Sequence, residues 1–279
     1  SLKLYPGKCE DSNVENLDGE KDILTVHPED PSLLSDVGED GNVEDFLESR
    51  PKKAESSEIY KILSMVSNFH PHFCHVTNEK SVEIINDAKR DRTVTCEVTP
   101  HHLLLDENDF RDRGSYLKMY PPLRSERDRK KMIQSLKNGL IDIVATDHAP
   151  HTNAEKHVDD PFGSIRGVSH GFVGLETAVP MLLTFADRGR LSYTKWIGLH
   201  SAMPARVWGL NPEKGSLDVG TDADIVIVDP EREWTFDRAN LRSKGTVTPF
   251  DGERFRGAVV TTIVRGRAVY EDGAVPGDS

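Results

Sequence analysis

Polar side chains that bind metals well stand at the ends of several apolar runs in this 279-residue chain. His27 follows the run ILTV, His75 follows HFC, and Asp147 follows IVAT. Imidazole nitrogens and carboxylate oxygens are ligands of zinc-like ions, and an ion with one open position makes hydroxide available near neutral pH. A lone histidine of this kind is more often structural. Three residues in equivalent positions favour a hydrolytic metal site.

The elements that position these residues alternate between strand-like and helix-length stretches. We predict strands at 22–27, 72–77, 93–102 and 141–148, and helices at 56–69, 79–90, 125–139, 175–189 and 192–209. Ser125 and Gly139 are candidate caps of the third helix, and Ser192 of the last. The alternation is typical of parallel βα units, whose active sites form at the carboxyl ends of the strands. Residues distant in sequence are therefore expected to converge there.

The pattern changes after residue 211. Short strand-like runs separated by Gly and Asp turns predict a small β-domain at 211–279, after a barrel domain at 1–210. Residues 30–55 are acidic and weakly periodic, so we predict a solvated helix and loop there.

Composition favours a small-molecule substrate. The 47 acidic and 35 basic residues give a net charge of −12, which disfavours binding to nucleic acid phosphates. The three cysteines are widely separated and match no secreted disulfide framework, and no apolar run reaches the roughly 20 residues of a membrane span. We expect a cytoplasmic protein that binds neither nucleic acid nor membrane.

Three other motifs have weaker functional interpretations. His70 and His72 could present two imidazoles on one strand face, but they lie where a helix should turn into a strand, so a surface turn is favoured. The stretch GVSHG at 167–171 matches G-x-S-x-G but lacks the preceding buried strand of a nucleophile elbow. His101 and His102 are either supports for metal ligands or hydrogen-bonding core residues, and the structural interpretation is favoured.

The stretch ATDHAPHTNAEK at 145–156 resembles the signature of dihydroorotases, which Lys156 completes. Other segments that resemble the family follow in its order and cover nearly the whole chain, with 30–58 the weakest part. They include LKLYPG, VHPED, CHVTNEKSVEII, EVTPHHLLL, PPLRS, GLETAVPMLL, PARVWGL, KGSLDVGTDADIVIVD and TPFDG.

The resemblance implies an amidohydrolase-type (β/α)₈ TIM barrel with a small β-sandwich domain, and one or two Zn²⁺ ions per site. It implies reversible hydrolysis of L-dihydroorotate to N-carbamoyl-L-aspartate in pyrimidine synthesis. His27 and His75 resemble ligands of one metal, and Asp147 resembles a ligand of the other and the general base. His151 resembles a contact to the substrate carboxylate. Lys3 matches a lysine that some members carboxylate to bridge two metals.

Arg124 is a candidate to hold a substrate carboxylate by a bidentate contact, with a surface role equally open. Tyr120 stands where the family usually has an asparagine that contacts the pyrimidine ring, so we expect it to alter substrate fit.

The chain contains no HxHxR segment, which in the family supplies two metal ligands and a substrate-binding arginine. By the resemblance, Lys3 lies on the fourth barrel strand, so we expect the C-terminal two-thirds of a dihydroorotase, with an incomplete second metal site and little activity alone. Exposed sheet edges would favour a homo-oligomer or a partner chain. The alternatives are a related allantoinase or hydantoinase, and a non-catalytic dihydroorotase-like partner subunit.

Overall fold

The computed structural model describes residues 2–5, 23–65 and 69–275, and every structural statement below concerns those residues. By their internal packing they form two compact units. The first unit comprises residues 1–173 and 243–249, and the second comprises 174–242 and 250–279.

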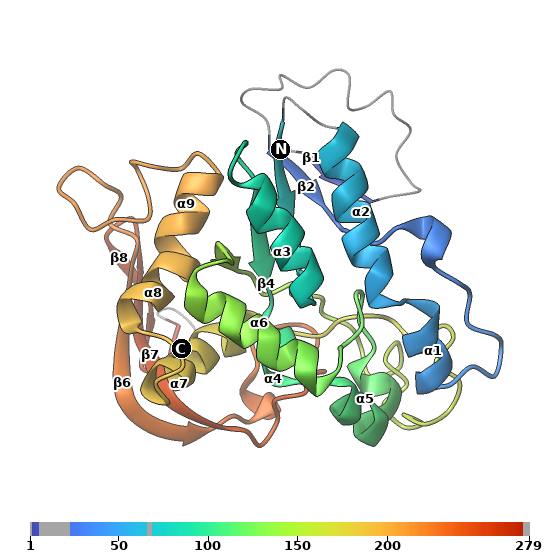
Figure 1. The fold of residues 1–279 in the computed structure, drawn as a ribbon. Coiled ribbons are helices and arrows are strands. Elements are labelled where there is room, and N and C mark those ends of the chain that lie inside the picture. The colour runs from blue at the N-terminus through green and yellow to red at the C-terminus, as the bar shows by residue number, and fades with distance from the viewer. Residues whose placement is uncertain (1, 6–22, 66–68, 276–279) are drawn as a thin grey trace. The chain divides into compact units, whose positions relative to one another are not determined.

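The first unit is built on a parallel sheet of five strands in the order β1-β2-β3-β4-β5 (Figure 1). The strands are β1 (Leu2–Leu4), β2 (Ile23–Val26), β3 (His70–Phe73), β4 (Thr95–Val98) and β5 (Ile143–Val144). Each strand lies beside the next one in the chain, as in consecutive strands of a βα barrel. The predicted fold class, a barrel of the TIM type represented by part of its strands, is therefore confirmed.

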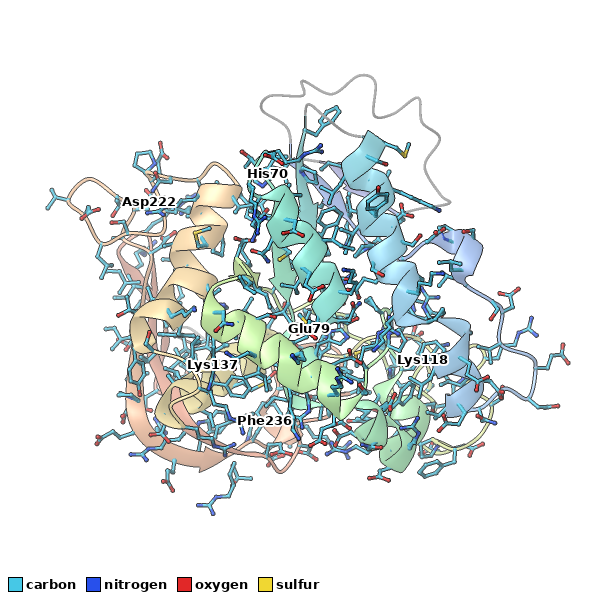
Figure 2. All side chains as sticks on the ribbon, viewed as in Figure 1. His70, Glu79, Lys118, Lys137, Asp222 and Phe236 are labelled. Carbon is cyan, nitrogen blue, oxygen red and sulfur yellow. The ribbon has the colours of Figure 1, made fainter. Side chains whose placement is uncertain are left out.

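Helices connect β2 to β5 and cover the sheet. They are the 3₁₀ turn η2 (Pro31–Leu33), α1 (Val43–Ser49), α2 (Lys52–Met65), α3 (Glu79–Ala88), α4 (Pro100–Leu104), α5 (Glu107–Arg113), the 3₁₀ turn η3 (Gly114–Leu117) and α6 (Glu126–Asn138). Figure 1 shows α2, α3 and α6 side by side, and these neighbours pack together. An ion pair of 2.8 Å joins Lys131 Nζ on α6 to Glu79 Oε1, labelled at the start of α3 in Figure 2.

Apolar strand residues bury against these helices. Leu24, Val26, Phe73, Cys96 and Val98 are fully buried. The alternate strand positions carry polar side chains, and the register aligns them in one row: Lys3 pairs with Thr25, Thr25 with His72, and His72 with Thr95. Because successive strand residues face opposite sides, this polar row and the apolar core occupy different faces of the sheet.

Several helix ends lie where the sequence predicts them. The Ser125 side chain accepts from the Asp128 amide at the start of α6, and Gly139 ends that helix with φ of 77°. Ser192 likewise caps α8 (Tyr193–Ile197) by accepting from the Lys195 amide. These local signals act through short-range hydrogen bonds and backbone freedom, so they depend little on tertiary context.

Three local predictions are wrong, the third in part. The surface turn favoured at residues 70–72 is the start of β3, and His72 is fully buried, because pairing with β2 overrides the turn signal of Pro71. The predicted strand at 93–102 ends at Val98, since Pro100 opens α4. The acidic stretch 30–55 contains helix as expected, but Asp30 and Glu55 in it are buried and not solvated.

The second unit combines helices with an antiparallel sheet. Its helical segments are α7 (Leu175–Asp187), α8, the π-turn η4 (Gly198–Ala202), α9 (Met203–Val207) and the 3₁₀ turn η5 (Arg238–Asn240). Its strands are β6 (Ile225–Thr235), β7 (Arg254–Val264) and β8 (Arg267–Glu271), paired in the order β6-β7-β8.

Packing of α7 on β7 organises this second unit. A Cβ at Gly257 would lie only 2.5 Å from Leu183 Cβ, so the close approach of strand and helix requires a glycine there. The boundary between the two units thus lies just before α7, at residue 174, whereas the sequence pattern changes only after residue 211. The domain boundaries of 1–210 and 211–279 stay a prediction. No helix among the described residues is long and apolar enough to cross a membrane.

Candidate functional site

Three of the four predicted metal ligands follow the carboxyl ends of strands in the parallel sheet. Lys3 lies within β1, His27 directly follows β2, His75 follows β3 by two positions, and Asp147 follows β5 by three. Neighbouring parallel strands of similar length bring such residues to one edge.

His27 and His75 are in direct contact. The Nδ1 atom of His27 lies 3.0 Å from Nε2 of His75, and the ring centroids are 4.7 Å apart in an edge arrangement. The other nitrogen of His27, Nε2, lies 2.8 Å from a carboxylate oxygen of Glu29. When Nε2 donates its proton to Glu29, Nδ1 is left with a lone pair that faces His75.

The His75 side chain fits a cation at this place. Its Nδ1 atom is buried and has no hydrogen-bond partner among the described residues, while its Nε2 faces the lone pair of His27. Burial lowers the pKa of His75 well below its usual value, so the ring is neutral and has a lone pair for a metal. Two imidazoles with facing nitrogens form a suitable pair of ligands for a zinc-like ion.

Asp147 is coupled electrostatically to the same group. Burial raises the pKa of its carboxyl, and the positive charge of Lys3 is the largest effect that opposes this shift. A carboxylate with a raised pKa is better suited to take and return a proton near neutral pH.

Unusual backbone conformations mark these positions. His75 has φ of 35° and Asp147 has φ of 47°, both in the left-handed region that non-glycine residues rarely adopt. Such conformations cost on the order of 1–3 kcal/mol and cluster at functional sites. The fold therefore keeps His75 and Asp147 in strained conformations at the edge of the sheet where the metal site is expected.

A second group of residues surrounds Tyr120. The guanidinium of Arg50 lies 3.8 Å from the Tyr120 ring centroid, and the His170 ring stacks at 4.2 Å with an interplanar angle of 24°. Arg50 also binds Glu29, so one chain of contacts leads from His27 to Tyr120. Tyr120 thus stacks with a cation and with an imidazole.

His151 lies in the long loop between β5 and α7. Its Nε2 atom is 2.9 Å from the carbonyl oxygen of His170, and the side chain is a quarter exposed. Two buried lysines hold this loop: Lys118 Nζ donates to the carbonyls of Ile165 and Val168, and Lys156 Nζ donates to those of Lys118 and Ser169. His151 is therefore attached to an ordered loop.

Arg124 is not a surface residue. It is 8% exposed, and its guanidinium donates to Thr77 Oγ1 at 3.0 Å and to the carbonyl of Arg50. Its charge also faces the fully buried carboxylate of Glu55. Two nitrogens of Arg124 are thus engaged within the protein, and Nη2 has no hydrogen-bond partner among the described residues.

The structure favours the structural interpretation of the other motifs. His102 is buried between Thr99 Oγ1 at 2.6 Å and the Pro121 carbonyl at 3.2 Å, and His101 packs edge-on against Phe172. The fully described stretch 145–174 contains no strand, so residues 167–171 lack the context of a nucleophile elbow.

Sequence reasoning missed Glu29, Arg50 and His170. Glu29 has a weak signal, because it follows a predicted ligand by two positions and carboxylates often orient ligating histidines. No pattern in the sequence points to Arg50 or His170, which reach the site only through tertiary packing.

Comparison with known proteins identifies the family of this chain and several relatives. The profile of the amidohydrolase family matches residues 30–269. A dihydroorotase from Lactobacillus acidophilus is 37% identical over 259 residues, and one from Bacillus subtilis is 38% identical over 261. Both alignments cover 90% of this chain, which spans 60% and 58% of the respective relatives.

Solved structures give the same architecture. An L-hydantoinase from Arthrobacter aurescens has a TM-score of 0.83 at 32% identity, covering 91% of this chain and 58% of that one. A dihydropyrimidinase from Brevibacillus agri has a TM-score of 0.88 at 22% identity, covering 99% and 64%, and supports the fold alone.

Proposed function

Because this chain belongs to the amidohydrolase family, we propose that it carries the catalytic core of a zinc-dependent dihydroorotase. The reaction is the reversible hydrolysis of L-dihydroorotate, a cyclic amide, to N-carbamoyl-L-aspartate, a step in pyrimidine synthesis. The convergence of His27, His75 and Asp147 at one edge of the sheet carries this proposal. The dihydroorotases at 37–40% identity support this substrate.

Each residue has a role that its surroundings support. His27 and His75 would hold a zinc ion, and Lys3 together with Asp147 would contribute to a second one. A bound zinc ion supplies polarisation of the ring carbonyl and an activated water. Asp147 would take a proton from the attacking water and give it to the leaving ring nitrogen, for which its raised pKa is suited.

The substrate carboxylate is assigned to His151, which is oriented by its contact to the His170 carbonyl. Arg124 is the weaker candidate, because its guanidinium already binds Thr77 and the Arg50 backbone. Tyr120 stacks with Arg50 and His170, so it would act on substrate fit through its hydroxyl edge and its bulk and not by stacking on the ring of the substrate.

Hydantoin opening is the second candidate, because the L-hydantoinase matches the structure with a TM-score of 0.83. Both substrates are cyclic amides, and a carboxylate on the ring separates them. A site that uses His151 to bind this carboxylate should therefore discriminate against hydantoin and allantoin.

The test measures binding and turnover by the zinc-loaded chain with dihydroorotate, N-carbamoyl-L-aspartate, hydantoin and allantoin. We expect binding of the first two only, with slow interconversion because the second metal site is expected to be incomplete. Asp147→Asn should lower kcat about 10²–10⁴-fold with binding retained, whereas Asp159→Asn, at an exposed position in the same loop, should change neither. Turnover of hydantoin or allantoin alone overturns the proposal. Binding of N-carbamoyl-L-aspartate without turnover favours a non-catalytic partner subunit, and no binding of either compound refutes the substrate assignment.

A further inference from the structure

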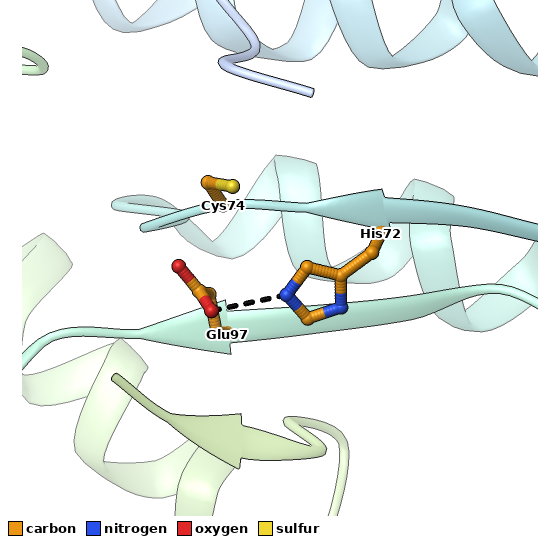
Figure 3. A group of neighbouring side chains, drawn as sticks. All are labelled: His72, Cys74 and Glu97. Carbon is orange, nitrogen blue, oxygen red and sulfur yellow. Dashed lines mark hydrogen bonds and ion pairs between the residues drawn. The ribbon is translucent and has the colours of Figure 1, made fainter. Parts of the chain in front are cut away.

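A second cluster of metal-competent side chains lies on the sheet and includes none of the predicted ligands described above. His72 on β3 and Cys74 directly after it are two positions apart and share one face, and Glu97 reaches the same place from β4 (Figure 3). One ligand atom from each lies within 4.8 Å of the others. It is the one such group of three among the described residues.

We propose that His72, Cys74 and Glu97 form a separate binding site for a soft divalent cation of the zinc class. Imidazole nitrogen, thiolate sulfur and carboxylate oxygen together match the ligand preference of such ions, whereas magnesium and calcium prefer oxygen alone. Three protein ligands leave a fourth position for water, as is common for zinc.

The surroundings of His72 allow this ligand arrangement. Its Nδ1 atom lies 2.8 Å from Thr95 Oγ1, and its Nε2 lies 3.0 Å from Glu97 Oε2. When Nδ1 carries the proton and donates it to Thr95, the lone pair of Nε2 points toward the carboxylate. Two acceptors would then face each other, which is favourable only with a cation between them.

Thr95 accommodates both forms of the site. Its hydroxyl also lies 2.9 Å from Nε2 of His70, so it can donate to one ring while it accepts from the other. Without an ion, Thr95 donates to Nδ1 of His72, and Nε2 of His72 donates to Glu97. With an ion, the Thr95 hydroxyl would donate to Nε2 of His70 and accept from Nδ1 of His72, so that Nε2 of His72 is left with its lone pair for the ion. Each ring keeps its proton, which moves from Nε2 to Nδ1, and none is released by this change.

The cluster is mostly buried but can be reached from solvent on one side. The His72 side chain is fully buried and Cys74 is buried, whereas 13% of the Glu97 side chain is exposed, so an ion would enter past the carboxylate. On binding, the S–H bond of Cys74 breaks, a sulfur–metal bond forms, and the proton leaves to solvent.

Cys96 provides a matched comparison. It is also buried and lies on β4 next to Glu97, but its neighbouring position in the strand places it on the opposite face. Its sulfur lies 3.8 Å from the Leu140 carbonyl and belongs to no metal-competent group of three among the described residues. Removal of this thiol should therefore leave the proposed site intact.

The experiment titrates the purified full chain with Co²⁺ and follows the thiolate-to-cobalt charge-transfer absorption. A chain with the substitutions Cys9→Ser and Cys96→Ser keeps only Cys74, and we expect it to retain the band at one ion per chain. Cys74→Ser should abolish the band, and His72→Asn and Glu97→Gln should weaken the affinity at least tenfold. Circular dichroism of each variant verifies folding. If Cys74→Ser unfolds, Glu97→Gln takes its place as the test, because Glu97 is the most exposed of the three residues.

His27→Asn separates this site from the proposed catalytic one. We expect it to leave the cobalt–thiolate band unchanged, whether or not the chain turns over dihydroorotate. The proposal is overturned if no band forms, if the band survives in Cys74→Ser, or if His27→Asn removes it.

Discussion

The carboxylate of Glu29 lies 2.8 Å from Nε2 of His27 and is itself 2% exposed. Arg50 binds the same carboxylate and, with His27, lowers its pKa against the opposing effect of burial, so Glu29 stays charged and keeps its acceptor role. A charged acceptor fixes the proton of His27 on Nε2 and turns Nδ1 toward His75.

Replacement of Glu29 should therefore weaken metal binding at the His27–His75 pair. We expect Glu29→Gln to lower zinc affinity about 10–100-fold, measured by competition with a chelator. Glu44→Gln removes a more exposed carboxylate that also pairs with an arginine, and should leave the affinity unchanged. Equal affinities in both variants would show that Glu29 does not orient the ligand.

Arg124 is expected to contribute to stability more than to substrate binding. Arg124→Met leaves the fully buried Glu55 carboxylate without its opposing charge, so we expect a loss of about 3–5 kcal/mol in the free energy of unfolding, measured by urea denaturation. Arg127→Met, at an exposed position in the first turn of the following helix α6, should cost under about 0.5 kcal/mol. Adding Glu55→Gln to Arg124→Met should restore part of the loss. A substrate-binding role alone would predict normal stability and weaker binding.

Stability should rise with pH because of Lys156. Burial lowers the pKa of its amine to about 7, with a further contribution from Lys118. The unfolded chain keeps the proton up to its normal pKa of about 10.4, so between about pH 7 and that value the unfolded state binds more protons than the folded state. The free energy of unfolding should increase across this window by up to about 1.4 kcal/mol per pH unit.

Lys156→Met removes this contribution, so urea denaturation between about pH 6 and pH 9 should give a flatter pH dependence for the variant. Lys53→Met, at an exposed position, should show the same pH dependence of the free energy of unfolding as the unchanged chain. Parallel curves for the unchanged chain and Lys156→Met would contradict a buried amine that becomes neutral in this range.

Tyr120 should stabilise the arrangement of Arg50 and His170. Tyr120→Asn, which introduces the residue that the family resemblance leads us to expect here, removes the cation–π contact with Arg50 and the stacked pair with His170, together worth about 1–3 kcal/mol, as well as the more distant ring contacts with Phe46 and Lys118. Tyr120→Phe retains these ring contacts and should keep the thermal unfolding temperature close to its original value. An equal decrease in both variants would show that the hydroxyl, and not the ring, is the stabilising group.

The sequence by itself determined the parts of this protein that depend on short-range physics and on strand order. Ser125 and Gly139 mark the ends of α6, because caps act within one helical turn. The alternation of strands and helices predicted a parallel sheet. In such a sheet, residues that follow neighbouring strands come to the same edge, as His27 and His75 do.

Only the tertiary structure decided which polar residues are buried and which partners they have. His72 was expected in a surface turn, yet it lies in a strand beside Glu97, because pairing between distant segments outweighs the local signal of Pro71. Arg50 and His170 come together at Tyr120 across more than 100 positions, through packing that no local pattern encodes. Burial then lowers the pKa of His170 to about 4, since the cost of desolvation depends on the surrounding protein and not on neighbours in sequence.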